Sequence, residues 1–456
     1  MSRARSTIAV LSLALSLSAG CANQSLEEDC GSGTCENLGP TSDEQLLALL
    51  DSHGVAALDF GPAADPRQVE LGRALFFDRE LSGNRDISCA TCHHPLAGSG
   101  DDLALPIGTG GRGLATERVL GEGRGFIPRN APEVFNRGAD GWNTMFWDSR
   151  VSTQPVVVSP AGKKLPASLS DPLAIQAMFP PTSAAEMRGA PGDLDVFGYS
   201  NELALLAEDD VTGIWQGIME RVMAIDEYQR LFAAAFPSVS EPGFEHAATA
   251  IAAFEKEAFA FADSPFDRYL AGDTDAMSPA AKRGAILFYG DAGCGSCHSG
   301  SLMTDQKSHS ICAPQLGPGK AEGDDLGVQA LSSDSADAYA FRTPPLRNVE
   351  TTGPWMHSGA YADLELAVRH HLDPIKALMK YDESQLPPSL RSTLRRDPDT
   401  LAAMGASIDP LVATPIELDD NQFDDLMSFL YALTDPRVHD MASLVPSQVP
   451  SGLPLD

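Results

Sequence analysis

Two clusters of cysteine and histidine with identical spacing carry the clearest chemistry in this chain. They read Cys89-Ala90-Thr91-Cys92-His93 and Cys294-Gly295-Ser296-Cys297-His298. Two thiols at this spacing can add to the two vinyl groups of one haem, and the histidine that follows lies under the iron as an axial ligand. A zinc knuckle or redox dithiol is the alternative, but a zinc site needs its four ligands close in sequence and these motifs lie about 200 residues apart. The motifs therefore predict two covalently bound haem c groups, with His93 and His298 as proximal ligands.

The charge of the chain limits its partners. The formal net charge is −31 over 456 residues, and the acidic residues are spread along the chain. This disfavours nucleic acid and anionic membrane surfaces as partners. It favours the docking of a basic electron-donor protein, although a solvated acidic surface suited to a saline medium explains the charge equally well.

Residues 1–21 have the pattern of an export signal. Arg3 and Arg5 form a short basic region, and residues 8–17 form an apolar core that is too short to span a bilayer. Ser18-Ala19-Gly20-Cys21 is similar to a bacterial lipobox, which predicts a lipid anchor on Cys21 after cleavage; ordinary secretion is the alternative. Both predict a periplasmic or outer-membrane-attached protein that contacts the membrane only through the lipid anchor.

The remaining cysteines suit an oxidising compartment. Residues 22–42 are expected to be a flexible tether, in which a Cys30–Cys35 disulfide would close a small Gly-Ser loop. Cys312 is then unpaired, and we expect a buried thiol without a function. No segment after the signal is long and apolar enough to be a membrane helix.

An internal repeat predicts two haem-binding units. Gly72-Arg73-Ala74-Leu75-Phe76 precedes the first haem motif, and Gly284-Ala285-Ile286-Leu287-Phe288 precedes the second. We expect each to end a helix that packs over a haem. The predicted organisation is an N-terminal haem domain at 43–263, a C-terminal haem domain at 264–440 and a tail at 441–456.

The fold class predicted from the apolar pattern is mainly α, with two cytochrome c-like haem domains and long loops. Apolar residues recur at helical spacing over 244–261 and again over 420–433. Strand signals are few and short. Long loops suit a haem protein, because the cofactor fills much of the core.

The amino-acid sequence around these motifs resembles that of the bacterial dihaem cytochrome c peroxidases and their relatives of the MauG type, including the MbnH-like branch. The resemblance covers about residues 65–435 in family order. It rests on residues 72–82 and 87–93, Arg129-Asn130-Ala131-Pro132, Phe146-Trp147-Asp148, Ala185-Glu186-Met187, residues 341–348 and Trp355-Met356-His357-Ser358-Gly359.

The resemblance implies roles at the first haem. The N-terminal haem is peroxidatic in this family, so His93 would be its proximal ligand. Glu186 matches the distal carboxylate, which can take a proton from bound hydrogen peroxide and return it to the leaving oxygen. Gln176 and Pro180 match other residues that line the pocket.

The resemblance also implies residues between the haems. Trp147 matches a tryptophan that helps to relay electrons, although a core aromatic role is compatible with the same position. Asn130, Thr343 and Pro345 match positions that hold Ca²⁺, partly through backbone carbonyls. Oxygen ligands suit that ion, but carbonyl ligands leave no signature in the sequence.

The distal ligand of the second haem departs from the peroxidases, where it is methionine, and from MauG, where it is tyrosine. The matching stretch, residues 364–371, places His371 at the ligand position, with His370 as the competing candidate. A bis-histidine iron is expected to be low-spin and of lower potential than a histidine–methionine iron. His357 is expected to have a structural role.

A second departure concerns the loop after the first haem motif. In the peroxidases a histidine of this loop caps the peroxidatic iron until the enzyme is reduced, and Thr109 stands at that position here. No histidine occurs between His94 and His246. The first iron is therefore expected to be open without reductive activation.

Three functions follow from the resemblance. The first is reduction of hydrogen peroxide with electrons from a small cytochrome c or cupredoxin, delivered through the C-terminal haem. The second is a MauG-like or MbnH-like oxidation of a residue, with tryptophan preferred, on a partner protein through a high-valent dihaem state. The third is non-catalytic electron transfer, which the missing loop histidine disfavours. Homodimers are common among the relatives, and no surface feature establishes one here.

Overall fold

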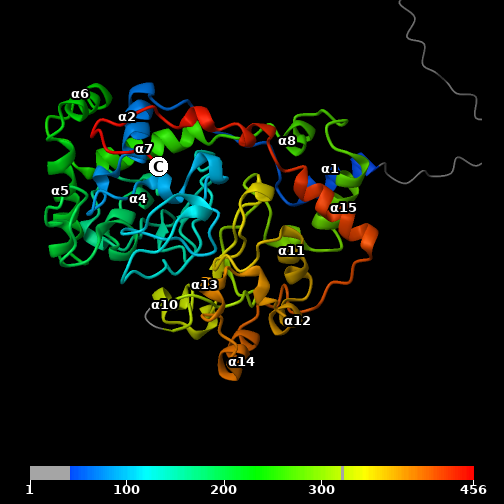
Figure 1. The fold of residues 1–456 in the computed structure, drawn as a ribbon. Helices are drawn as coiled ribbons and strands as arrows, with labels where there is room; N and C mark the ends of the chain where they lie inside the picture. Colours follow the sequence, from blue (N-terminus) through cyan, green and yellow to red (C-terminus); the bar gives the residue numbers. More distant parts are fainter. Residues whose placement is uncertain (1–41, 320–322) are drawn as a thin grey trace, which may run out of the picture. The chain divides into compact units, whose positions relative to one another are not determined.

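The computed structural model describes residues 42–319 and 323–456, and within them the chain is mainly helical with long connecting loops (Figure 1). The predicted signal, the lipid anchor at Cys21 and the Cys30–Cys35 disulfide lie outside the described residues. None of the helices in these two ranges is long and apolar enough to cross a membrane. The α-helices are α1 (Ser42–Ser52), α2 (Pro66–Phe77), α3 (Cys89–Cys92), α4 (Pro172–Ala177), α5 (Val211–Val222), α6 (Asp226–Ala235), α7 (Phe244–Ala258), α8 (Pro265–Leu270), α9 (Pro279–Tyr289), α10 (Gln329–Ser332), α11 (Leu364–Leu372), α12 (Pro374–Met379), α13 (Pro388–Arg391), α14 (Pro398–Ala406) and α15 (Asp420–Tyr431).

Strands are short, as the sequence predicts. In the described part of the chain they form two antiparallel pairs, each of two-residue strands: β1 (Thr144–Met145) with β2 (Val151–Ser152), and β3 (Ser308–His309) with β4 (Phe341–Arg342). These pairs hold loops that carry site residues. They build no extended sheet.

The first hydrophobic core forms where α2 packs on α7. Leu71, Leu75 and Phe76 of α2 are fully buried and belong to the same apolar cluster as residues of α4, α5 and α6. Gly72 permits this close approach, because a Cβ there would lie 1.8 Å from the carbonyl oxygen of Ala250. The helix predicted over 244–261 ends at Ala258, and the rest of that prediction is an apolar loop.

The second core repeats the arrangement with α9 and α15. A Cβ on Gly284 would lie 1.9 Å from the carbonyl oxygen of Asp425 of α15, so the second helix pair also meets at a glycine. Phe423 and Phe429 of α15 are buried in this cluster. The repeat predicted from Gly72 and Gly284 therefore corresponds to two equivalent helix crossings.

The ends of the described chain pack on the core that is distant in sequence. Leu46 and Leu50 of α1 are buried in the second core. At the other end, Met441 and Val449 belong to the first core, and the end of the chain lies beside α2 and α7 (Figure 1). The chain passes from one core to the other between Phe261 and Phe266. The division into domains at 263/264 stays a prediction.

Candidate active site

The first haem motif lies on the wall of a cavity beneath the first core. Cys89 and Cys92 begin and end α3, which Ser88 and Thr91 cap reciprocally. The two cysteines and His93 line a void of about 1250 Å³ that is open to solvent. Burial lowers the pKa of His93 to about 4, so its ring is neutral and able to bind a metal. These donors fit a haem c attached through two thioethers.

The predicted distal residues line the same cavity. Gln176 lies near the end of α4, Pro180 begins the next turn, and Glu186 lies in the single helical turn η6 (Ala184–Arg188). The hydroxyl of Ser183 caps this turn by accepting from the backbone N–H of Glu186 at 3.3 Å. The cavity therefore brings together a haem-attachment histidine, a carboxylate and an amide, which can bind and protonate a small oxygen substrate.

The loop after the first motif contributes little to the cavity. Thr109 is 2% exposed and does not line it, and His93 is the only histidine among the described residues that does. His94 is buried outside this cavity, with its Nδ1 accepting from the N–H of Leu96 at 3.1 Å. The structure thus brings no second histidine to the position opposite His93.

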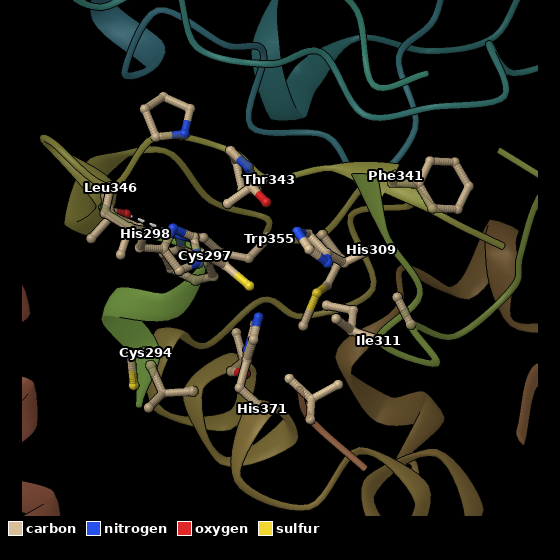
Figure 2. Close-up of a pocket in the computed structure, with 18 of the residues that line it drawn as sticks. Cys294, Cys297, His298, His309, Ile311, Phe341, Thr343, Leu346, Trp355 and His371 are labelled. Carbon is tan, nitrogen blue, oxygen red and sulfur yellow. Dashed lines mark hydrogen bonds between the residues drawn. The ribbon is translucent and has the colours of Figure 1, made fainter. Parts of the chain in front are cut away.

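The second haem motif lines a larger void of about 1610 Å³, also open to solvent. Cys294, Cys297 and His298 lie on one side, and His371 points toward them from α11 (Figure 2). Nδ1 of His298 lies 3.2 Å from the carbonyl oxygen of Met303, and Nδ1 of His371 lies 2.8 Å from that of Ala367. With Nδ1 donating to a carbonyl, each ring leaves Nε2 free for a metal.

His370 is arranged differently from its neighbour. It is fully buried and does not line the cavity. Its Nδ1 lies 2.8 Å from the hydroxyl of Tyr361, and its Nε2 lies 2.7 Å from the carbonyl oxygen of Ile311. Both ring nitrogens are engaged, so the geometry favours His371 as the distal ligand.

Trp147 lines both cavities, together with Asn130 and Arg342. Its indole N–H donates to the carbonyl oxygen of Asn130 at 2.9 Å. The predicted aromatic between the two haem sites therefore lies in the wall that the cavities share.

The three predicted calcium residues, Asn130, Thr343 and Pro345, all line the second cavity. The carbonyl of Asn130 accepts from Trp147, and that of Thr343 accepts from Thr304 Oγ1 at 2.6 Å and from Arg342 at 3.3 Å. The calcium site stays a prediction.

His357 and Cys312 have structural environments. The ring of His357 stacks on Phe341 with centroids 3.5 Å apart, and burial lowers its pKa to about 3. Cys312 is 1% exposed and has no cysteine partner among the described residues. Its thiol lies 3.3 Å from the carbonyl oxygen of Met404.

Sequence reasoning did not single out several charged groups that line the cavities, among them Arg342 and His309. Arg342 is buried between them, forms no ion pair within the described ranges, and has a pKa lowered to about 9 by burial and by the nearby Arg137. His309 lines the second cavity with Nδ1 2.7 Å from Asp409 and Nε2 3.0 Å from Asp305. Asp305 is the largest cause that raises the pKa of His309 to about 11. Arg342 stood inside a quoted motif, whereas nothing in the sequence marked His309.

Comparisons with known proteins match this geometry. The profile of the di-haem cytochrome c peroxidase family matches residues 66–275. The methylamine utilization protein MauG of Methylorubrum extorquens is 34% identical over 67% of this chain and 69% of its own length. The cytochrome c551 peroxidase of Pseudomonas aeruginosa is 30% identical over 68% of this chain and 72% of its own length.

Solved structures share the fold. A MauG-like protein associated with microbial copper homeostasis is 25% identical, with a TM-score of 0.58, and the match covers 86% of this chain and 96% of that one. The diheme peroxidase BthA from Burkholderia thailandensis has a TM-score of 0.56 at 23% identity over 84% of this chain and 88% of its own. The second likeness bears on the fold alone.

Proposed function

Because this chain belongs to the family of dihaem cytochrome c peroxidases and MauG proteins, we propose that it reduces hydrogen peroxide at the first cavity. Membership makes it a dihaem oxidoreductase that acts on peroxide. One observation carries the finer proposal. Among the residues that the structure describes, the first cavity holds one histidine, from the haem-attachment motif, together with the carboxylate of Glu186.

The residues present fit one haem c in each cavity. In the first, Cys89 and Cys92 would form the thioethers and His93 would bind the iron. In the second, Cys294 and Cys297 would form the thioethers, with His298 and His371 as axial ligands. The haems would supply the iron that binds peroxide and the centres that carry electrons.

Glu186 would act as the acid and base of the reaction. Its carboxylate would take a proton from one peroxide oxygen and deliver it to the other, so that this oxygen leaves as water. Two electrons and two further protons complete the conversion of one peroxide into two water molecules. Gln176 would orient the peroxide by hydrogen bonding, because its amide both donates and accepts.

The electrons would come through the second cavity. A small donor protein, a cytochrome c or a cupredoxin, would pass them to the haem held by His298 and His371. Trp147 lies in the wall between the cavities and would relay them. The negative charge of the chain suits a basic donor. Export to the periplasm, with a lipid on Cys21, would place the protein where such donors occur.

A second function is oxidation of a side chain, with tryptophan preferred, on a partner protein. Two observations favour it. No loop histidine faces His93 among the described residues, and at the second cavity His371, rather than a methionine, would be the distal ligand. The two oxidising equivalents of one peroxide would then be held at the two haem sites, and the electrons that consume them would come from the partner protein.

The test is optical and EPR spectroscopy of the oxidised, as-isolated protein, before and after one equivalent of hydrogen peroxide without a donor. We expect one high-spin and one low-spin haem and an immediate reaction with peroxide. When a reduced one-electron donor is then added, two donor molecules should be oxidised for each molecule of peroxide. If both haems are low-spin and do not react with peroxide until the protein has been reduced, the proposal of an open first haem site is wrong. A peroxide reaction at both haems with negligible donor turnover would favour the second function.

A further inference from the structure

We propose that Thr109 and Asp86 are positioning residues that hold Glu186 over the first cavity, an inference that rests on the acid–base role proposed for Glu186. The backbone N–H of Thr109 donates to the carbonyl oxygen of Glu186 at 2.8 Å. Its hydroxyl donates to Oδ1 of Asp86, also at 2.8 Å. Asp86 lies shortly before Cys89, so this buried threonine joins the haem-attachment segment to the turn that carries the distal carboxylate.

Asp86 holds the loop at a second point. Its Oδ2 accepts from the backbone N–H of Gly110 at 2.7 Å. One carboxylate thus binds two successive residues of the loop, and hydrogen bonds to a charged acceptor are stronger than those between neutral groups.

Arg118 holds other residues of the loop by hydrogen bonds to their backbone. Its guanidinium donates to the carbonyl oxygens of Ile107 at 2.7 Å, Gly108 at 2.8 Å and Gly113 at 2.9 Å. Gly108 also touches the turn that carries Glu186, because a Cβ there would lie 1.8 Å from the carbonyl oxygen of Ala185. The backbone of the loop around Gly108 therefore packs directly against the turn η6.

The turn needs this support. The segment η6 (Ala184–Arg188) is a single turn, and so short a helical segment is not stable without tertiary contacts. A displacement of about 1 Å in a catalytic group can reduce a rate by about 100-fold. The bonds of Thr109 and Asp86 fix the backbone of Glu186 relative to the residues that hold the haem.

The experiment compares Thr109→Val with Thr109→Ser in the holoprotein. Valine keeps the shape and the backbone N–H but removes the hydroxyl, whereas serine keeps the hydroxyl. Stopped-flow spectroscopy measures the second-order rate constant for hydrogen peroxide and, separately, the reduction of the second haem by reduced donor. We expect Thr109→Val to lower the peroxide rate constant by roughly tenfold or more. The donor step should be unchanged, and Thr109→Ser should restore the peroxide step.

Two controls separate positioning from general damage. Thr249→Val removes another threonine hydroxyl, which donates to the carbonyl oxygen of Glu245 on α7, and should leave the peroxide rate constant unchanged. Haem content and melting temperature are measured for every variant. In a Glu186→Gln background, Thr109→Val should cause no further loss, because the two residues would act through one group.

A wild-type peroxide rate constant in Thr109→Val would overturn the proposal, and so would an equal loss in the Glu186→Gln background. If Glu186→Gln alone reacts with peroxide at the wild-type rate, the proposed role of Glu186 is wrong and this inference falls with it. A loss in Glu186→Gln with none in Thr109→Val leaves the proposed function standing and overturns only the positioning role.

Discussion

The indole N–H of Trp147 donates to the carbonyl oxygen of Asn130, and both residues line both cavities. The wall between the two sites is thus an aromatic ring held to the backbone of the neighbouring segment. Removing the hydrogen bond and removing the ring are separable experiments.

Trp147→Phe keeps an aromatic ring and removes the indole N–H. The unpaired carbonyl of Asn130 should cost about 1 kcal/mol of stability. The smaller, repositioned ring should slow electron transfer from the second haem to the first without changing the first encounter with peroxide. Stopped-flow traces at the two haem spectra distinguish these steps. If the peroxide reaction and the electron transfer between the haems slow equally, Trp147 supports the first cavity rather than relaying electrons.

Glu186→Gln removes the proposed acid and base but keeps the size of the side chain. The peroxide rate constant should fall by roughly 10²- to 10⁴-fold, the usual contribution of a positioned proton-transfer group. Glu241→Gln, at an exposed position, is the matched control and should have no effect. The pyridine haemochrome assay should report two haems in both variants. Unchanged turnover in Glu186→Gln would remove this residue from the mechanism.

His371→Ala removes the proposed distal ligand of the second haem. EPR should then report a high-spin second haem in place of a low-spin one. His370→Ala is the control, because both nitrogens of His370 are occupied by protein groups. It should keep the low-spin signal and lose roughly 1–3 kcal/mol of stability for each buried partner left unpaired. The opposite pattern would assign the ligand to His370.

Arg129 joins two buried carboxylates next to the first cavity. It lies 2.6 Å from Asp148 and donates to Asp325 at 2.6 and 2.8 Å. Burial raises the pKa of each aspartate, but the positive charge of Arg129, together with that of Arg150 at Asp148, outweighs it, so both pKa values lie below the ordinary value of an aspartate. A lowered folded pKa contributes stability that is present above the unfolded pKa and is lost as the pH falls through the folded value.

Arg129→Gln should therefore cost about 3–5 kcal/mol at pH 7, because two buried carboxylates lose their partner. The difference in the free energy of unfolding between Arg129→Gln and wild type should become smaller below pH 4, because the aspartates become protonated. Urea denaturation at several pH values measures both effects. Arg283→Gln, which breaks an exposed pair with Asp425, should change the stability little. A cost for Arg129→Gln that does not change with pH would contradict the assignment.

Gly284→Ala tests the second helix crossing. Helix propensity alone would stabilise α9 by about 1 kcal/mol, but the new methyl group would meet the carbonyl oxygen of Asp425. Overpacking of this kind costs about 1–3 kcal/mol or more, so the variant should be less stable than wild type. A Cβ on Gly405 in α14 would make only an ordinary van der Waals contact, 3.7 Å from Cδ1 of Ile375, so Gly405→Ala should gain stability. Thermal denaturation of the two variants gives the comparison, and a stabilised Gly284→Ala would refute the close crossing.

Local patterns in the sequence were enough for the helices that carry the cores. The apolar spacing predicted α7 and α15, and the repeat around Gly72 and Gly284 predicted two equivalent units. The cavity around His93 also collects Gln176, Pro180 and Glu186, which were assigned by resemblance to family motifs.

Features that depend on tertiary contacts could not be predicted. His370 and His371 are adjacent, and what distinguishes them is that His370 bonds Tyr361 and Ile311, which are 9 and 59 residues away in the sequence. Thr109 was recognised as a missing histidine, but its bond to Glu186 depends on how a loop meets a turn far along the chain. The occupied carbonyl of Thr343 likewise depends on contacts that leave no pattern in the residue types.

The packing of each end of the described chain on the distant core has a consequence for the order of folding. As the polypeptide emerges from its amino end, α1 appears first, yet its neighbours α9 and α15 appear much later. The first core gains Met441 and Val449 only when the polypeptide is nearly complete. Each haem-attachment motif therefore emerges before the helix that completes the crossing in its own core, the first motif before α7 and the second before α15. Such long-range contacts slow folding, which leaves time in which the cysteines are accessible to the machinery that attaches haem.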